Sequence, residues 1–239
     1  MKVTIFLSLP TDLSRKVFLF PRESSTDHVN LITKLEKPLQ NFTLCFRAYS
    51  DLSCGYSLFS YNTQGKDNEL LIFKDRIGEY SLYIGRTRVT ARVIEEFPTP
   101  VHICTSWESS TGIAEFWING KPLVKKGLRQ GYSVGANPKI VLGQEQDSYG
   151  GGFDKTQSFM RQIGDLYMWD SAVSRRDPVC VSAFLLPQPH HPKLAGSELW
   201  NERLRCHQAP GVGLRSGIHK STWKWNNQHP RALLKATGY

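Results

Sequence analysis

No run of apolar residues in the sequence approaches the roughly 18–20 that a membrane-spanning helix needs, which excludes an integral membrane protein built from such helices. The five cysteines include no Cys-x-x-Cys pair, so neither a zinc ribbon nor a thioredoxin-type site is expected. Low-complexity segments are absent and 40% of the residues are hydrophobic, which argues against global disorder. The 239 residues suffice for one large or two small soluble domains with a full core.

Positive charge is concentrated at one end of the chain. The sequence carries 30 Lys and Arg against 21 Asp and Glu, a formal net charge of +9, which suggests a nucleic-acid or membrane-surface partner. Ten of the basic and three of the acidic residues lie between Ser171 and the end, a net of +7 that leaves +2 for residues 1–170. A nucleic-acid-binding function that depends on Lys and Arg would therefore reside in the tail.

Short β-like runs separated by turn residues fill residues 16–170. In one of them Phe42, Leu44, Phe46 and Ala48 alternate with other residues, as a strand with one buried face requires. Asn119-Gly120 predicts a two-residue hairpin, because both residues accept a positive φ. Strands about every 10–15 residues, with no long helical period, predict an all-β antiparallel sandwich or jelly roll. The other strand-like runs are Tyr56–Tyr61, Glu69–Phe73, Tyr80–Gly85, Val101–Trp107, Ile113–Ile118, Lys139–Leu142 and Asp165–Trp169.

The two ends of the chain depart from this pattern. Residues 1–10 combine one positive charge with a short apolar run, as in a remnant of a signal peptide, although a first β-strand or a mis-assigned start explains them equally well. After Asp170 the alternation fails and the stretch from Phe184 to Pro192 is rich in Pro and His, so we expect loop or disorder there. The sequence thus predicts a C-terminally incomplete jelly-roll domain over residues 11–171 and an aberrant basic tail over 172–239.

Two clusters of acidic and amide residues could hold a hard cation. One is Asp67-Asn68-Glu69, and the other is Gly143-Gln-Glu-Gln-Asp147, which leads into a Gly-rich stretch and on to Gln157. Calcium takes about six to eight oxygen ligands from carboxylates, amides and backbone carbonyls. Glu145 and Asp147 face the same way on an extended chain and repel each other unless a cation lies between them. The alternative is a pair of solvated turns, and the spacing of an EF-hand loop is missing.

Catalytic interpretations find less support in the sequence. A carboxylate pair could serve a glycan-processing enzyme on a jelly roll, but only His28 and His102 lie in the domain and there is no Gly-x-Ser-x-Gly elbow or phosphate loop. His102 and Cys104 could form a Cys–His nucleophile, which a disulfide at Cys104 would exclude. Cys45 and Cys104 both lie in strand-like runs, which favours a disulfide between them. The sequon Asn41-Phe-Thr permits glycosylation if the chain is secreted.

One strand-like run carries a specific motif. His102-Ile-Cys-Thr-Ser-Trp-Glu-Ser109 matches the pentraxin signature His-x-Cys-x-Ser/Thr-Trp-x-Ser/Thr. The chain resembles the pentraxin family from about Thr11 to Ser171. The further segments that carry the resemblance are Phe-Pro-Arg-Glu-Ser at 20–24, Asn41-Phe-Thr-Leu-Cys, Phe116-Trp-Ile-Asn-Gly-Lys-Pro and Leu142-Gly-Gln-Glu-Gln-Asp-Ser.

This resemblance implies a flattened jelly roll that assembles into a cyclic homopentamer. It also implies a secreted, calcium-dependent, lectin-like protein of innate pattern recognition, not an enzyme, with nucleic acid only as a polyanionic ligand. The ligand classes would be phosphate monoesters, phosphoethanolamine-like head groups and acidic saccharides. The family's two calcium ions would be held by Asp67, Asn68, Glu145, the carbonyl of Gln146, Asp147 and Gln157.

The resemblance assigns roles to residues around this metal site as well. Leu71, Phe73 and Tyr83 match positions that line an apolar pocket beside the ions, with ordinary sheet packing as the alternative. The family disulfide corresponds to Cys45–Cys104. Cys54 has no counterpart and is left either as a free thiol or as a source of off-pathway bridges.

The tail is the part of the sequence that does not fit the family. Codons chosen for Lys193–Trp200 and read one base later encode Asn-Trp-Gln-Ala-Leu-Asn-Tyr, which resembles the family's own segment, and the same shift can be continued through Leu214. We therefore hypothesise that the residues after Ser171 are a frame-shifted translation; a genuine alternative tail is the rival explanation. Without the family's helix and terminal strands, an apolar surface and a sheet edge would be uncovered, so poor folding or pentamer formation is expected.

Overall fold

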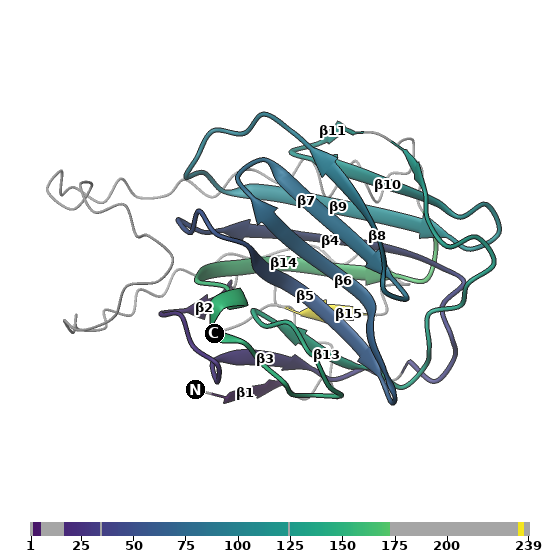
Figure 1. Cartoon of the computed structure of the whole chain (residues 1–239), viewed down its shortest axis with the longest axis horizontal. Helices are drawn as coiled ribbons and strands as arrows, with labels where there is room; N and C mark the ends of the chain where they lie inside the picture. The colour runs from purple at the N-terminus through teal and green to yellow at the C-terminus, as the bar shows by residue number, and fades with distance from the viewer. Residues whose placement is uncertain (1, 6–16, 34, 124, 173–233, 237–239) are drawn as a thin grey trace, which may run out of the picture.

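Two β-sheets stacked face to face make up the described part of the molecule (Figure 1). The computed structural model describes residues 2–5, 17–33, 35–123, 125–172 and 234–236. Strand neighbours run antiparallel except at one N-terminal pair. The prediction of an all-β antiparallel sandwich is therefore confirmed, and a short 3₁₀ helix, η1 (Lys155–Gln157), is the one helical element within the described residues.

The first sheet has seven strands, and four of them follow one another as hairpins. Its N-terminal strand runs parallel to its neighbour, so Lys2–Ile5 has the strand structure that was one alternative for the first ten residues. In spatial order the strands are β1 (Lys2–Ile5), β3 (His28–Leu31), β13 (Lys139–Leu142), β5 (Tyr56–Thr63), β6 (Lys66–Arg76), β7 (Glu79–Ile84) and β8 (Thr87–Arg92).

The second sheet has eight strands. In spatial order they are β11 (Lys121–Pro122), β10 (Ile113–Ile118), β9 (Val101–Glu108), β4 (Asn41–Tyr49), β14 (Arg161–Trp169) and β15 (Leu234–Ala236), with β12 (Lys126–Gly127) on β10 and β2 (Val17–Phe20) on β14. The predicted hairpin is confirmed, since Asn119 and Gly120 join β10 to β11 with φ of 49° and 76°.

The tail contributes one described element, the strand β15, which pairs with β14. The expectation of loop or disorder after Asp170 is therefore wrong for Leu234–Ala236, where backbone hydrogen bonding to a long central strand overrides the absence of any alternating pattern. The frame-shift hypothesis concerns all residues after Ser171. The structure describes residue 172 and Leu234–Ala236 of this tail, and 173–233 and 237–239 lie outside the described residues.

The core lies between the two sheets. Phe42, Leu44 and Phe46 of β4 point into it and are fully buried, as their alternation predicted. Each such side chain contributes about 1.5–3 kcal/mol by leaving water. By contrast, β5 is buried at every position, including Ser57 and Ser60, because its outer face is covered as well. This cover is part of the candidate site described below.

A second, smaller apolar cluster lies on the outer face of the eight-stranded sheet. It contains the disulfide between Cys45 and Cys104, directly opposite each other on β4 and β9, together with Trp117 and Trp169. The disulfide matches the predicted pairing and excludes Cys104 as a nucleophile. The neighbouring His102 is buried, and its pKa is lowered to about 3 by desolvation, with a smaller contribution from the positive charge of Arg47.

Two further features concern a cysteine and a buried ion pair. Cys54 is disulfide-bonded too, so the free-thiol alternative does not hold. The ammonium group of Lys74 pairs with the carboxylate of Glu95, and the two side chains are only 5% and 4% exposed. The hydroxyl of Tyr80 donates to the other oxygen of Glu95 at 2.5 Å, and Lys74 lies 5.0 Å from the Tyr80 ring centroid. This pair fastens the connection between β8 and β9 to β6.

Within the described residues, the seven-stranded sheet ends at β8. Along this strand Arg88 and Arg92 are exposed, and the ammonium of Lys126 donates to the backbone carbonyl of Thr90 at 2.6 Å. Among the described residues there is no helix long and apolar enough to cross a membrane.

Candidate metal centre

The two acidic-amide segments meet at one end of the seven-stranded sheet. Asn68 lies near the start of β6, and Glu145 lies in the loop after β13; the amide nitrogen Nδ2 of Asn68 donates to Glu145 Oε1 at 3.1 Å. Asn62, near the end of β5, joins both segments. Its Oδ1 accepts from the backbone N–H of Asn68 at 2.9 Å, and its Nδ2 donates to the backbone carbonyl of Gln146 at 2.7 Å.

Gln146 is fixed in the protein through its side chain. Its Nε2 donates to the carbonyls of Ser60 and Lys139 at 2.9 and 3.0 Å, and its Oε1 accepts from the N–H of Gly150 at 3.0 Å. The side chain covers the outer face of β5 and is fully buried. Of the oxygens of Gln146, the backbone carbonyl is thus the one suited to a cation, because it retains a second lone pair beside the bond from Asn62.

Negative charge accumulates around Glu145. Burial raises the pKa of its carboxyl group, and the charges of Asp147, Asp67 and Asp154 raise it further, against the opposing hydrogen bond from Asn68. Asp154 also accepts from the N–H of Thr156 at the start of η1. Asp154 is not among the ligands predicted from the sequence; its position three residues before Gln157 was the available signal. A cation at this place would relieve the repulsion.

Three amide oxygens are buried without a hydrogen-bond partner within the described chain: Oδ1 of Asn68, Oε1 of Gln144 and Oε1 of Gln157. Those of Asn68 and Gln157 belong to the predicted ligand set. Buried polar atoms are normally paired, so each unpaired one calls for an explanation. Amide oxygens are regular calcium ligands. The residues present therefore fit a calcium ion.

Asp67 is paired with an arginine in this structure. The guanidinium group of Arg86, in the turn between β7 and β8, donates to Asp67 Oδ1 through Nε at 2.7 Å and through Nη2. Among the described residues, Asp67, Glu145 and Asp147 do not form a group of three closely spaced metal-ligand atoms. The one such group among the described residues is Cys45, His102 and Cys104, where the disulfide leaves no thiolate to bind a metal.

The three predicted pocket residues share the outer face of the seven-stranded sheet, the face that Gln146 covers in part. Leu71 and Tyr83 are directly opposite each other on β6 and β7, and Phe73 lies two positions along β6. Leu71 is buried, and the other two are half-buried. Arg88 donates to the Tyr83 hydroxyl at 3.2 Å. Leu71, Phe73 and Tyr83 make an apolar strip, and the positively charged guanidinium group of Arg88 lies at its end.

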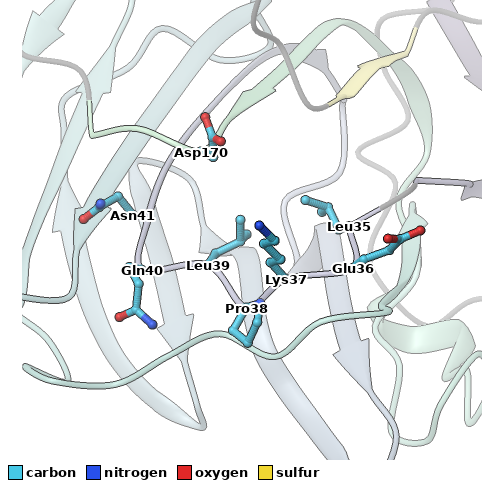
Figure 2. A pocket seen from close by; sticks show the side chains of 8 residues that line it. All are labelled: Leu35, Glu36, Lys37, Pro38, Leu39, Gln40, Asn41 and Asp170. Carbon is cyan, nitrogen blue, oxygen red and sulfur yellow. The ribbon is translucent and has the colours of Figure 1, made fainter.

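A separate pocket of about 420 Å³ lies elsewhere, and none of the predicted metal ligands lines it. Its lining consists of residues 35–41 and Asp170 (Figure 2). Asn41, the sequon residue, begins β4, is partly exposed and is one of the lining residues; in Figure 2 its side chain points away from that of Lys37.

Comparison with known proteins finds similarity to pentraxins in a family model, in curated sequences and in a solved structure. The model of the Pentaxin family matches residues 16–184, beyond Ser171. Serum amyloid P-component from Sus scrofa is 80% identical over 177 residues, covering 72% of this chain and 79% of that protein. The human protein of the same name is 81% identical over 163 residues, covering 68% and 73%. A heptameric SAP-like pentraxin from Limulus polyphemus has a similar fold, with a TM-score of 0.61 and 24% identity over 67% of this chain and 79% of its own.

Proposed function

Since the chain belongs to the Pentaxin family, we propose that it binds anionic ligands through calcium held by the two acidic-amide segments. At the level of the family it is a lectin-like recognition protein, not an enzyme, which removes the glycan-processing alternative. The observation that carries the proposal is the convergence of Asn68 and Glu145, together with the two unpartnered amide oxygens of Asn68 and Gln157.

Six residues would hold two calcium ions per subunit. Calcium supplies concentrated positive charge with open coordination positions, which suit an oxygen of a phosphate or carboxylate. On the protein side, the Asn68 amide would turn its oxygen inward and give up the bond to Glu145. Asp67 would leave Arg86. The proposed ligands are Asp67, Asn68, Glu145, the carbonyl of Gln146, Asp147 and Gln157.

The apolar strip selects among anionic ligands. A ligand with its charged group at the metal can lay a short apolar or amine-bearing portion over Leu71, Phe73 and Tyr83, which share one face. Phosphate monoesters, phosphoethanolamine-like head groups and acidic saccharides fit this combination of charge and apolar surface. Nucleic acid enters only as one more polyanion.

We also propose that the chain is secreted, glycosylated at Asn41 and assembled into a homopentamer. The cross-strand disulfide supports an oxidising compartment, because such bonds persist mainly outside the cytosol. Pentamer formation is the part that depends on the tail, and the sequence of the transcript decides whether the tail is frame-shifted. An in-frame message for residues 172–239 as written would contradict that hypothesis.

Retention on a phosphoethanolamine matrix tests the function. The full chain is expected to bind in calcium buffer and to elute with EGTA. Glu145→Gln should abolish retention, whereas Glu115→Gln, a control on β10 whose partner is Lys125 at 2.5 Å, should leave it intact. Binding that persists in EGTA, or a folded sample that never binds, would overturn the proposal.

A further inference from the structure

Two cationic side chains from two segments lie over the ring of Tyr132, and the turn that carries a third, Arg86, contacts the same ring. The guanidinium carbon of Arg129 lies 4.3 Å from the ring centroid, and the ammonium of Lys66 lies 5.5 Å from it. Arg86 belongs to the turn that touches the same ring, because a Cβ on its neighbour Gly85 would lie 2.7 Å from Cζ of Tyr132 and 3.1 Å from Nη2 of Arg129. Only glycine permits this close approach.

Hydrogen bonds through Glu69 fix the position of Tyr132. Its hydroxyl donates to Oε1 of Glu69, whose other oxygen accepts from the N–H of Gly135 at 2.6 Å. Glu69 is fully buried, although the sequence presents it as the third member of an acidic cluster. Its hydrogen bonds show that it anchors Tyr132 and is not free to bind a metal. The ring is thus a fixed platform, over which the guanidinium group of Arg129 is held by a cation–π contact.

The charges around the platform are unevenly compensated. Lys66 lies 3.7 Å from Glu69, and Arg86 pairs with Asp67, but Arg129 forms no ion pair within the described part of the chain and is exposed. If calcium takes over Asp67, Arg86 also loses its counter-ion. One uncompensated guanidinium group would then lie over the platform and a second in the adjoining turn, beside Asp67.

We propose that Lys66, Arg86 and Arg129 around Tyr132 form a second anion subsite, for ligands that carry several sulfate or phosphate groups. One oxyanion of such a ligand would bind at the metal and another at this subsite, which Arg86 joins when the cation displaces it from Asp67. The coupling to the cation rests on the proposed function; the subsite itself does not. Guanidinium groups favour such oxyanions because their N–H pairs match the oxygen spacing.

Calorimetric titration of the full chain with two probes tests the subsite. Sucrose octasulfate carries many anionic groups, and phosphoethanolamine carries one phosphate. Arg129→Gln is expected to weaken octasulfate binding about threefold to tenfold and to lower the slope of log affinity against log salt by about 1, with phosphoethanolamine binding unchanged. Arg92→Gln, an exposed arginine of β8 paired with Glu79, is the matched control.

Arg86→Gln tests the exchange of partners. Because it removes a competing positive charge at Asp67, it is expected to tighten calcium binding about twofold to fivefold while it weakens octasulfate binding. Unchanged octasulfate affinity in Arg129→Gln, or an equal loss for both probes, overturns the subsite; unchanged or weaker calcium binding in Arg86→Gln overturns the exchange. A chain that binds no calcium but keeps the Arg129 effect in EGTA refutes the proposed function and leaves the subsite standing.

Discussion

The amide of Asn68 donates to the carboxylate of Glu145 at 3.1 Å, although 77 residues separate them in the sequence. This contact ties the start of β6 to the loop after β13. It also turns the amide nitrogen toward the carboxylate and leaves Oδ1 of Asn68 buried and unpartnered. The amide N–H of Asn68 thus occupies the position beside Glu145 in which we propose that a cation binds.

Glu145→Gln should therefore have opposite effects without and with calcium. The pKa of Glu145 is raised in the folded protein, so the charged form disfavours folding, and this cost grows as pH rises through the folded pKa. At neutral pH in EGTA the variant is expected to melt a few degrees above the wild type. In calcium it should lose the ligand-induced rise in Tm. A variant that melts lower in both buffers would contradict this prediction, and scanning calorimetry decides.

Replacing His102 should reduce acid sensitivity. Its folded pKa of about 3 lies below the usual value of 6.5, so its contribution to stability is complete above 6.5 and is lost as pH falls toward 3. The wild type should lose up to about 1.4 kcal/mol per pH unit relative to His102→Gln in this window. Urea unfolding at pH 7, 6 and 5 measures the difference; parallel curves for the two proteins would count against it.

The buried pair of Lys74 and Glu95 lends itself to a double-mutant cycle. Glu95→Gln leaves the ammonium of Lys74 buried without a counter-charge, which is expected to cost about 3–5 kcal/mol. Adding Lys74→Met should recover most of this loss, because the amide introduced by Glu95→Gln would still accept from Tyr80 and no charge would remain. Chemical denaturation gives the four free energies of unfolding. Additive losses in the double variant would show that the pair is not coupled.

Removing the disulfide should destabilise the domain strongly. Cys45 and Cys104 close a loop with a sequence separation of 59. The entropy that this loop removes from the unfolded chain corresponds to about 4 kcal/mol. The double variant Cys45→Ala/Cys104→Ala is compared with the oxidised parent by urea unfolding. A loss below about 1 kcal/mol would mean that the cross-link adds little to the strand pairing already present.

Among the strands that the sequence predicted, β4 has the clearest alternation of side chains. Phe42, Leu44 and Phe46 alternate because one face of β4 meets the core, and their burial follows. The strand β8 was missed because it is a polar edge strand, with Arg88 and Arg92 exposed. Edge positions carry little hydrophobic signal, so pattern analysis has little to detect there.

The candidate site was predictable in its residue types but not in its contacts. Carboxylates and amides in two segments indicated a cation, and the family resemblance joined the segments. The pairing of Arg86 with Asp67 depends on a turn with φ of 66° at Arg86, and no spacing rule predicts it. The buried role of Glu69 likewise depends on Tyr132, 63 residues away.

The edge strand β8, with its exposed arginines and the Lys126 contact, limits how copies of the chain can associate. A bare edge strand offers a row of backbone donors and acceptors to any passing strand, and this is a common start of aggregation. Here the backbone carbonyl of Thr90 already accepts a hydrogen bond from the ammonium of Lys126, and Arg88 and Arg92 are exposed along the same edge. Arg88 and Arg92 are also paired with Asp75 and Glu79, so a strand from a second copy would have to displace these ion pairs before it could reach the β8 backbone. A continuous intermolecular sheet through β8 is thereby disfavoured.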